Sequence, residues 1–360
     1  MNEPITAARL RGFGIVEVMV AMVIALLGMV VIFQVFAVSE STNRTAISGS
    51  DAQQNGAYSL YTLQQEIRQA GWGFNNSQAL GCNVEAYNAM LGALPAYTLA
   101  PVVIDAGPAN GSDTLEVNYG SQNLLVAPVA IFQNQASALD SFVVSNRYGF
   151  NVGDLFLAVE QGKPCTLAQA TSLPAAQSTT ILRAAGNSAY PYNDPSGSAA
   201  VYTTNAALYD LGPAPTRDIF GVINDQLTVV AALSSTTREV VADNIVQVKA
   251  QYGHDNGVDN GTVPAGAYVA GDGAVDSYDS VTPATAADWN QVLTVRVGLV
   301  ARSAQPEKPS NGGSTCDTTT AAPTWSGGTF DLSANASWMC YRYKVFETVI
   351  PVRNTLWTQG

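Results

Sequence analysis

Apolar residues are concentrated in one segment near the N-terminus. From Phe13 to Val38 the chain reads FGIVEVMVAMVIALLGMVVIFQVFAV, in which Glu17 is the single charged residue and Gln34 the only other strongly polar one. As a helix this segment would measure about 39 Å at about 1.5 Å per residue. The hydrocarbon core of a bilayer is about 30 Å thick, and no comparable apolar run occurs elsewhere in the chain. The pattern therefore predicts one transmembrane helix over residues 13–38.

The helical pattern continues beyond the apolar segment. Residues 39–70 contain no proline, and Leu60, Leu63 and Ile67 recur at helical spacing. The sequence Gly71-Trp72-Gly73 supplies a helix stop. We therefore expect residues 39–72 to form an amphipathic continuation of the same helix.

From about residue 73 to residue 360 the pattern changes to a period of two interrupted by turn residues, which is typical of strands. The expected strands are 113–119, 154–159, 226–231, 245–252, 291–302 and 341–353. Long loops rich in Gly, Pro, Ser, Thr and Asn separate them, notably 184–218, 253–288 and 303–337. The fold class predicted for the chain is α+β: a long N-terminal helix packed on antiparallel sheet with long decorating loops.

The composition and net charge of the chain exclude several classes of protein. Of the 360 residues 47% are hydrophobic and 12% charged, and the net charge is −12. This balance argues against nucleic acid as a direct partner, and it excludes a polytopic membrane protein and a fully disordered chain. Arg9 and Arg11 precede the apolar segment, whereas Glu40 and Arg44 are the only charged residues in the ten that follow it. The positive-inside rule therefore places the N-terminus in the cytoplasm and the globular part outside it.

The apolar segment differs from a removable secretory signal. Such signals have an apolar region of about 7–15 residues and an Ala-x-Ala-like cleavage site, and no such site follows Val38. A plain signal anchor fits the length. Glu17 is unusual in either case, because a carboxylate in hydrocarbon costs several kcal/mol unless it is paired. The simplest interpretation is that Glu17 lies solvated at the membrane interface.

The residues around Glu17 suggest a more specific interpretation. Gly12-Phe13-Gly14-Ile15-Val16-Glu17 resembles the class III signal of type IV prepilins. The resemblance implies a leader over residues 1–12, cleavage between Gly12 and Phe13 by a prepilin peptidase, and methylation of the new N-terminus at Phe13. It also implies that Glu17 pairs with the α-amino group of a neighbouring subunit during assembly. The sequence departs from that family at Gly14, where Ser or Thr is usual, and at Gln34, where many major pilins have proline.

Further stretches of the chain resemble the PilW-like minor pilins. They are QNGAY (54–58), EIRQAGW (66–72), GSDTLEVNYG (111–120), VGDL (152–155), CTLAQAT (165–171), VQVKAQYG (246–253), VRVGLVARS (295–303) and YRYKVFETVIPVRN (341–354). The resemblance implies a non-enzymatic component of the priming or tip complex that starts assembly of a type IV pilus for twitching, adhesion or DNA uptake. The implied partners are other minor pilins, the major pilin, the prepilin peptidase and the inner-membrane assembly platform. The implied location is the bacterial inner membrane, with a periplasmic C-terminal domain, and then the pilus at the cell surface.

Two other functions share some of these features. A wide pseudopilin of a type II secretion system would have the same signal, helix and sheet. A signal-anchored periplasmic enzyme would need only the anchor. The chain contains no nucleophile elbow, phosphate-binding loop or zinc-protease motif, and its one histidine, His254, is expected to be a solvated loop residue.

Four cysteines follow the apolar segment, at Cys82, Cys165, Cys316 and Cys340. An even number in an exported domain favours disulfides over free buried thiols, and four cysteines allow three pairings. Cys316–Cys340 is favoured because both flank one loop before the last strand, and Cys82–Cys165 then follows by elimination.

One loop has the composition of a calcium site. Asp255, Asp259, Asp272 and Asp276 lie between two strands, close to Asp279 and to several Asn and Gly residues. Calcium takes six to eight oxygen ligands, often from such side chains and from turn carbonyls. The EF-hand spacing is absent, so a solvated acidic loop is the competing interpretation. No other cofactor is expected.

Overall fold

The computed structural model describes residues 14–74, 78–122, 127–259, 269–309, 313, 315–352 and 354. The chain divides after Ser50 into two compact units, and the second comprises the residues from Asp51 onward. The predicted leader (1–12) and Phe13 lie outside the described residues.

Helix α1 (Ile15–Gln69) is continuous over 55 residues, as the pattern predicts. It ends at Gln69, and turns follow in which Gly71 and Gly73 have φ angles of 83° and 93°. These left-handed conformations favour glycine and end helices. The Nδ2 amide of Asn354 donates to the carbonyl oxygens of Gln69 (3.0 Å) and Ala70 (2.9 Å). It thereby satisfies backbone groups that the helix leaves unpaired.

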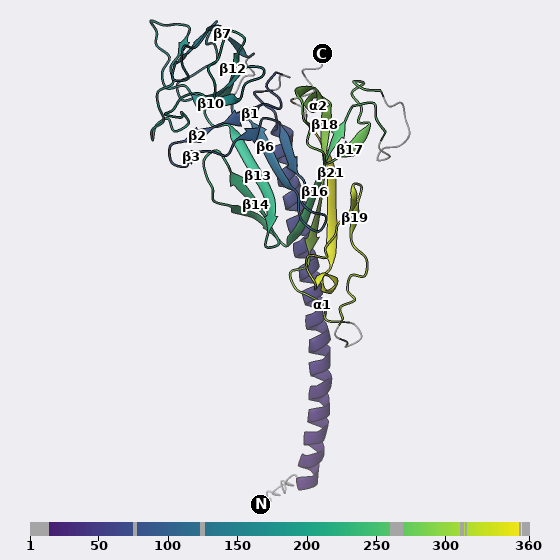
Figure 1. The fold of residues 1–360 in the computed structure, drawn as a ribbon. Coiled ribbons are helices and arrows are strands. Elements are labelled where there is room, and N and C mark those ends of the chain that lie inside the picture. Colours follow the sequence, from purple (N-terminus) through teal and green to yellow (C-terminus); the bar gives the residue numbers. More distant parts are fainter. Residues whose placement is uncertain are drawn as a thin grey trace, which may run out of the picture. The chain divides into compact units, whose positions relative to one another are not determined.

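The residues after α1 form three larger sheets (Figure 1). The eight-stranded sheet has the order β11 (Thr180–Ile181), β8 (Phe142–Val144), β7 (Val129–Gln133), β12 (Ala207–Gly212), β9 (Leu155–Val159), β10 (Cys165–Gln169), β1 (Asn83–Glu85) and β4 (Tyr97–Thr98). The five-stranded sheet has the order β15 (Glu239–Asp243), β14 (Gln226–Ala231), β13 (Thr216–Ile223), β6 (Thr114–Tyr119) and β5 (Val102–Asp105). The four-stranded sheet has the order β17 (Ser277–Asp279), β16 (Ile245–His254), β18 (Val292–Arg302) and β21 (Tyr343–Pro351).

The remaining elements are short. They are the hairpins β2 (Tyr87–Asn88)–β3 (Gly92–Ala93) and β19 (Thr324–Trp325)–β20 (Gly328–Thr329), helix α2 (Ala286–Asn290) and the 3-10 turn η1 (Trp338–Cys340). Among the strands that the structure describes, all pairs are antiparallel except β1–β10, where Val84 lies opposite Cys165. The protein is therefore an α+β protein with an N-terminal helix and mostly antiparallel sheets.

Each predicted strand corresponds to an observed one. The expected loops, in contrast, contain structure: β12 and the start of β13 lie in 184–218, β17 and α2 in 253–288, and the β19–β20 hairpin in 303–337. The alternation of apolar and polar residues does not reveal these elements, for a physical reason. β12 is buried on nearly all its residues, and only the first three residues of β13 lie within the expected loop. The other elements have two to five residues, too few to establish a period.

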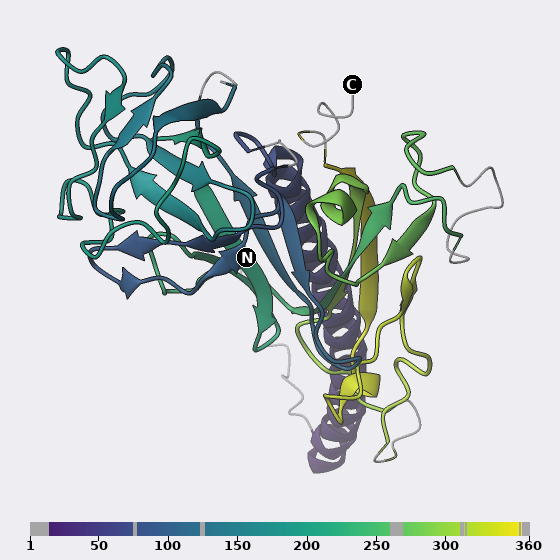
Figure 2. The same cartoon turned by 45° about the horizontal axis from the view of Figure 1, so that its top comes forward.

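One large core joins the C-terminal part of α1 to the five- and four-stranded sheets. Leu63 and Ile67 of α1 are fully buried with Leu115 of β6 and Val297 of β18. In Figures 1 and 2 this part of α1 lies beside β16, β18 and β21. The amphipathic half of the helix thus completes a core that these two sheets would otherwise leave open.

A second core lies in the eight-stranded sheet. Phe142, Phe156 and Tyr202 are fully buried there, and the rings of Phe142 and Phe156 meet edge to face at 5.4 Å. Strand β9 connects the two cores: Leu157 faces the large one, whereas its neighbour Phe156 faces the second. Because both faces are covered, β9 reads as a continuous apolar run.

Candidate functional site

The N-terminal part of α1 has the properties of a membrane span. Ile15–Glu40 is the one helical segment of the described residues that is long and apolar enough to cross a membrane. Its large apolar side chains are all exposed, from 42% at Val18 to 81% at Ile15. Glu17 lies in the first turn of the helix. Exposed apolar surface on this scale indicates a segment that contacts lipid or other apolar helices.

The C-terminal part of α1 is fitted to the sheet that it covers. Gly56 lies directly against Phe346 of β21, and a Cβ atom at this position would overlap the Phe346 ring. Ala52, one turn earlier, is 3% exposed. Sequence reasoning missed this contact, although a glycine inside a helical pattern is a signal of close packing.

A polar contact joins α1 to the five-stranded sheet. The Tyr119 hydroxyl donates to Oε2 of Glu66 at 2.8 Å. Nearby, burial raises the pKa of Asp218 to about 6, and the negative charges of Glu66 and Glu239 add to this effect. Asp218 therefore experiences repulsion from the carboxylates of Glu66 and Glu239, and protonation of Asp218 relieves this repulsion.

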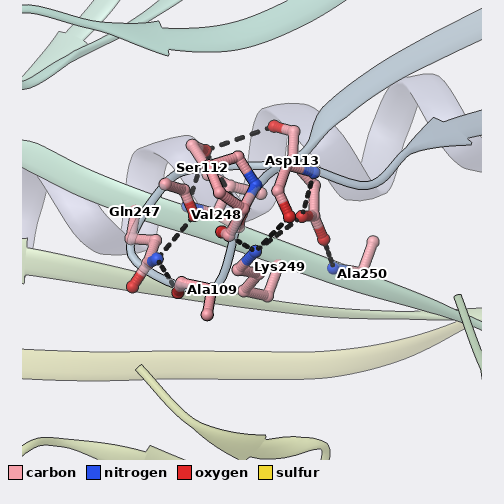
Figure 3. A network of polar contacts seen from close by, with 10 residues as sticks. Ala109, Ser112, Asp113, Gln247, Val248, Lys249 and Ala250 are labelled. Atoms are coloured by element: carbon pink, nitrogen blue, oxygen red, sulfur yellow. Dashed lines mark hydrogen bonds and ion pairs between the residues drawn. The ribbon is translucent and has the colours of Figure 1, made fainter. Parts of the chain in front are cut away.

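A buried ion pair joins the loop between β5 and β6 to strand β16 (Figure 3). Asp113 is 3% exposed, and its Oδ1 atom lies 2.8 Å from Nζ of Lys249. Its Oδ2 atom accepts the backbone N–H of Ala250 at 2.9 Å. The Ser112 hydroxyl accepts the N–H of Val248 at 3.0 Å. Since β6 belongs to the five-stranded sheet and β16 to the four-stranded one, this network connects the two sheets.

Two disulfides join the pair that the loop position favours in the sequence and the pair that follows by elimination. Cys82 bonds to Cys165, with Cα atoms 6.0 Å apart, and Cys316 bonds to Cys340, with Cα atoms 4.8 Å apart. The first links the residue before β1 to the start of β10. The second closes part of the segment 303–342, which we call the covering segment. Non-reducing peptide mapping would report this pairing directly.

The covering segment packs on the four-stranded sheet. Phe330 and Leu332 of this segment are buried with Val300 of β18. The indole ring of Trp325 lies against Gly298, where any Cβ atom would collide with it. Aromatic side chains therefore anchor the described part of the expected loop 303–337 to this sheet.

The acidic residues proposed for calcium have other contacts. Asp255 accepts the backbone N–H groups of Gly271 and Gly273, and Asp276 accepts that of Gly257. Asp272 accepts the N–H of Ala274. These bonds shape the turn after β16. No group of three or more acidic, histidine or cysteine side chains that could hold a metal is found in the described part of the chain, and residues 260–268 of this loop lie outside it. Calcium binding by this loop remains a prediction.

The expectation for His254 is wrong. The side chain is 7% exposed, because β16 extends to this residue and pairs it with Ser277 of β17. Its ring lies 6.0 Å from that of Tyr252, and Nε2 is 3.3 Å from Oδ1 of Asp279. His254 is therefore a packed residue of the sheet.

Two of the surface hollows lined by described residues are large enough for a small ligand. One, of about 400 Å³, lies at the end of α1 and includes Arg68, Trp72 and Asn354. The other, of about 340 Å³, lies on the eight-stranded sheet and includes Glu85 and Asp194. Neither lining contains histidine or cysteine.

Comparison with known proteins assigns the C-terminal part of the chain. Residues 224–354 match the model of the PilW family, described as type IV pilus-assembly protein W. No curated protein and no solved structure matches the chain. The matched region contains the four-stranded sheet, the covering segment and Asn354, which caps α1. Ile15–Glu40 and the eight-stranded sheet lie outside it. The match agrees with the motifs in the sequence, and residues 224–354 of the chain are similar to the PilW family of type IV pilus-assembly proteins.

Proposed function

We propose that this protein is a minor pilin that joins the priming or tip complex of a type IV pilus. The observation that carries the proposal is the continuity of α1: an apolar segment with an acid in its first turn runs without a break into a half that is packed on sheets. A pilin needs both parts in one helix, because the first half anchors the subunit and the second carries its globular domain. The PilW match supports the same class.

The proposed mechanism begins in the inner membrane, with the N-terminus in the cytoplasm and the globular domain in the periplasm. A prepilin peptidase cleaves after Gly12, and the amine of Phe13 is methylated. When the subunit enters the fibre, the carboxylate of Glu17 pairs with the α-amino group of a neighbouring pilin. Each charge alone would be costly in an apolar helix bundle, and the pair removes most of that cost.

The family match favours a pilus over the two alternative functions. PilW proteins are described as pilus-assembly proteins, which supports a structural rather than a catalytic role. A pseudopilin would share the helix but should co-purify with secretion pseudopilins. The expected partners are other minor pilins and the major pilin.

The proposal is tested by recovery of the protein in surface fibres. Fibres sheared from cells should contain the wild-type chain together with other pilins. Glu17→Ala should leave the protein in the membrane but reduce its amount in fibres at least about tenfold, which corresponds to about 1.4 kcal/mol of lost pairing. Glu40→Ala, which removes an acid at the other end of the same apolar segment, is the matched control and should retain incorporation. Equal incorporation of all three chains would contradict the proposed role of Glu17, and absence of the wild-type chain from fibres would contradict the minor-pilin assignment.

A further inference from the structure

A small cavity lies where the covering segment meets the turn between β13 and β14. Its volume is about 70 Å³, roughly the space of two water molecules in the liquid. The oxygen-bearing side chains of its lining come from five separate parts of the chain; they are Asn110, Asp225, Gln247, Asp331, Asn335 and Tyr343. Asn110 belongs to the β5–β6 loop, so the cavity lies beside the network of Figure 3.

Gln247 lines this cavity and has an unusual buried oxygen. The residue is 1% exposed. Its Nε2 atom donates to the carbonyl oxygens of Ala109 (3.1 Å) and Gly111 (2.5 Å), so the orientation of the amide is fixed by the loop. Figure 3 shows the amide nitrogen within this network and the amide oxygen outside it. No protein donor among the described residues reaches Oε1. A buried acceptor without a partner is destabilising, so a cation or a hydrogen-bond donor at this position would stabilise the protein.

Two carboxylates share the same cavity. Oδ1 of Asp331 accepts the N–H of Ser333 at 2.9 Å. Oδ2 of Asp225 lies 2.9 Å from Nη2 of Arg302. Arg302 thus offsets one of the two negative charges.

We propose that this cavity binds a hard divalent cation, with Ca²⁺ the best fit, through Oε1 of Gln247 and the carboxylates of Asp225 and Asp331. The oxygen donors match the preference of Ca²⁺, and neutral amide oxygens and waters complete its flexible shell of six to eight ligands. Mg²⁺ demands a stricter octahedral shell, which donors on several separate segments supply less well. With one net negative charge the site should be weak, in the range of about 10⁻⁴–10⁻³ M that is typical of extracellular modules.

Binding at this position would connect the covering segment to the rest of the protein. Asp331 belongs to that segment, whereas Asp225 belongs to the β13–β14 turn and Gln247 to β16. An ion held by all three would stabilise the contact of the covering segment with the four-stranded sheet. This site is separate from the acidic turn of Asp255 and Asp276, and it does not depend on the proposed pilus function.

Terbium luminescence tests the site, because Tyr343 lines the cavity and can sensitise a bound ion. The full chain in detergent, freed of metal with a chelator, is titrated with Tb³⁺ under tyrosine excitation and then with Ca²⁺. We expect a saturable signal that Ca²⁺ displaces. Asp331→Asn, which keeps the size of the side chain, should weaken binding at least about tenfold, and the increase in Tm that Ca²⁺ gives the wild-type chain should disappear.

Asp105→Asn is the matched control, because it makes the same change at an exposed position outside the cavity. It should leave both the Tb³⁺ affinity and the Ca²⁺-dependent Tm unchanged. Binding that survives Asp331→Asn but is lost with Asp272→Asn would place the ion in the acidic turn and overturn the proposal. Absence of saturable Tb³⁺ binding to the wild-type chain would also overturn it and would indicate that only water occupies the cavity.

Discussion

The two halves of α1 have the same secondary structure but opposite surroundings. In the first half Leu27 is 64% exposed, together with all the other large apolar side chains of Ile15–Glu40. In the second half Leu63 and Ile67 are fully buried, whereas Tyr58 and Tyr61 face outward. The second half therefore derives its stability from packing within this chain. The first half has an apolar surface all round and needs an apolar environment that the chain itself does not supply.

This difference explains why one helix can serve two environments. A periodic stripe of buried residues holds the globular domain to the second half, so the domain does not depend on where the first half resides. Substitutions in the two halves should then affect different properties. Three pairs of variants test this separation, from the largest expected effect to the smallest.

The same leucine substitution should have very different effects in the two halves. Leu63→Ala removes a fully buried side chain and should lower the free energy of unfolding of the globular domain by about 2–5 kcal/mol. Leu27→Ala should leave it unchanged within about 0.5 kcal/mol. Urea unfolding of the detergent-solubilised chain, followed by tryptophan fluorescence, measures both. A loss of similar size in the two variants would contradict the separation.

Two glycines of α1 should respond with opposite sign. At Gly49 an added Cβ atom meets nothing within 4 Å, so Gly49→Ala should leave stability unchanged or raise it by up to about 1 kcal/mol through helix propensity. At Gly56 the added Cβ atom meets the Phe346 ring, and overpacking of this kind costs about 1–3 kcal/mol. Gly56→Ala should therefore lower the Tm. An equal gain in both variants would show that the helix is not held against β21.

The carboxylates beside the second half predict a pH dependence. The folded-state pKa of Asp218, about 6, lies above its ordinary value of 3.8, so the folded protein binds this proton more tightly than the unfolded one. The contribution of this proton to the free energy of unfolding is complete below pH 3.8 and is lost as the pH rises through about 6. Asp218→Asn should therefore stabilise the domain at pH 7, by about 1–2 kcal/mol after allowance for solvent screening.

The control for this effect is Asp105→Asn, at an exposed position at the end of β5. It should not change the pH profile between pH 4 and pH 7. Glu66→Gln should lower the pKa of Asp218, because one of the charges that raise it is then absent. A profile that is unchanged in Asp218→Asn would show that this carboxyl is not responsible.

Strong local patterns allowed much of the fold to be predicted from the sequence. The length and apolarity of residues 13–38, the spacing of Leu60, Leu63 and Ile67, and the glycines after Gln69 together predict α1 and its end. Long strands such as β16, β18 and β21 alternate clearly enough to be predicted. The local position of Cys316 and Cys340 around one loop suggested a pairing that is present in the structure.

Features that depend on distant contacts could not be predicted in this way. The fit of Gly56 to Phe346 joins residues far apart in the sequence, and so does the pairing of Asp113 with Lys249. His254 looked like a loop residue because it stands beside Asp and Asn, but pairing with β17 buries it. The oxygen of Gln247 becomes notable only once its neighbours are known. Residues of the prepilin-like signal before Gly14 were identified by resemblance alone, and they lie outside the described structure.

The N-terminus of the mature protein is the most direct test of the proposal that the first half of α1 is a pilin anchor. Mass spectrometry of the protein extracted from membranes of cells that make the prepilin peptidase should find an N-terminal methylated Phe13. In the same cells Gly12→Val should leave an uncut precursor, because only glycine leaves the backbone at the cleavage site unobstructed. An intact Met1 terminus on the wild-type protein would contradict the pilin assignment and would favour a plain signal anchor.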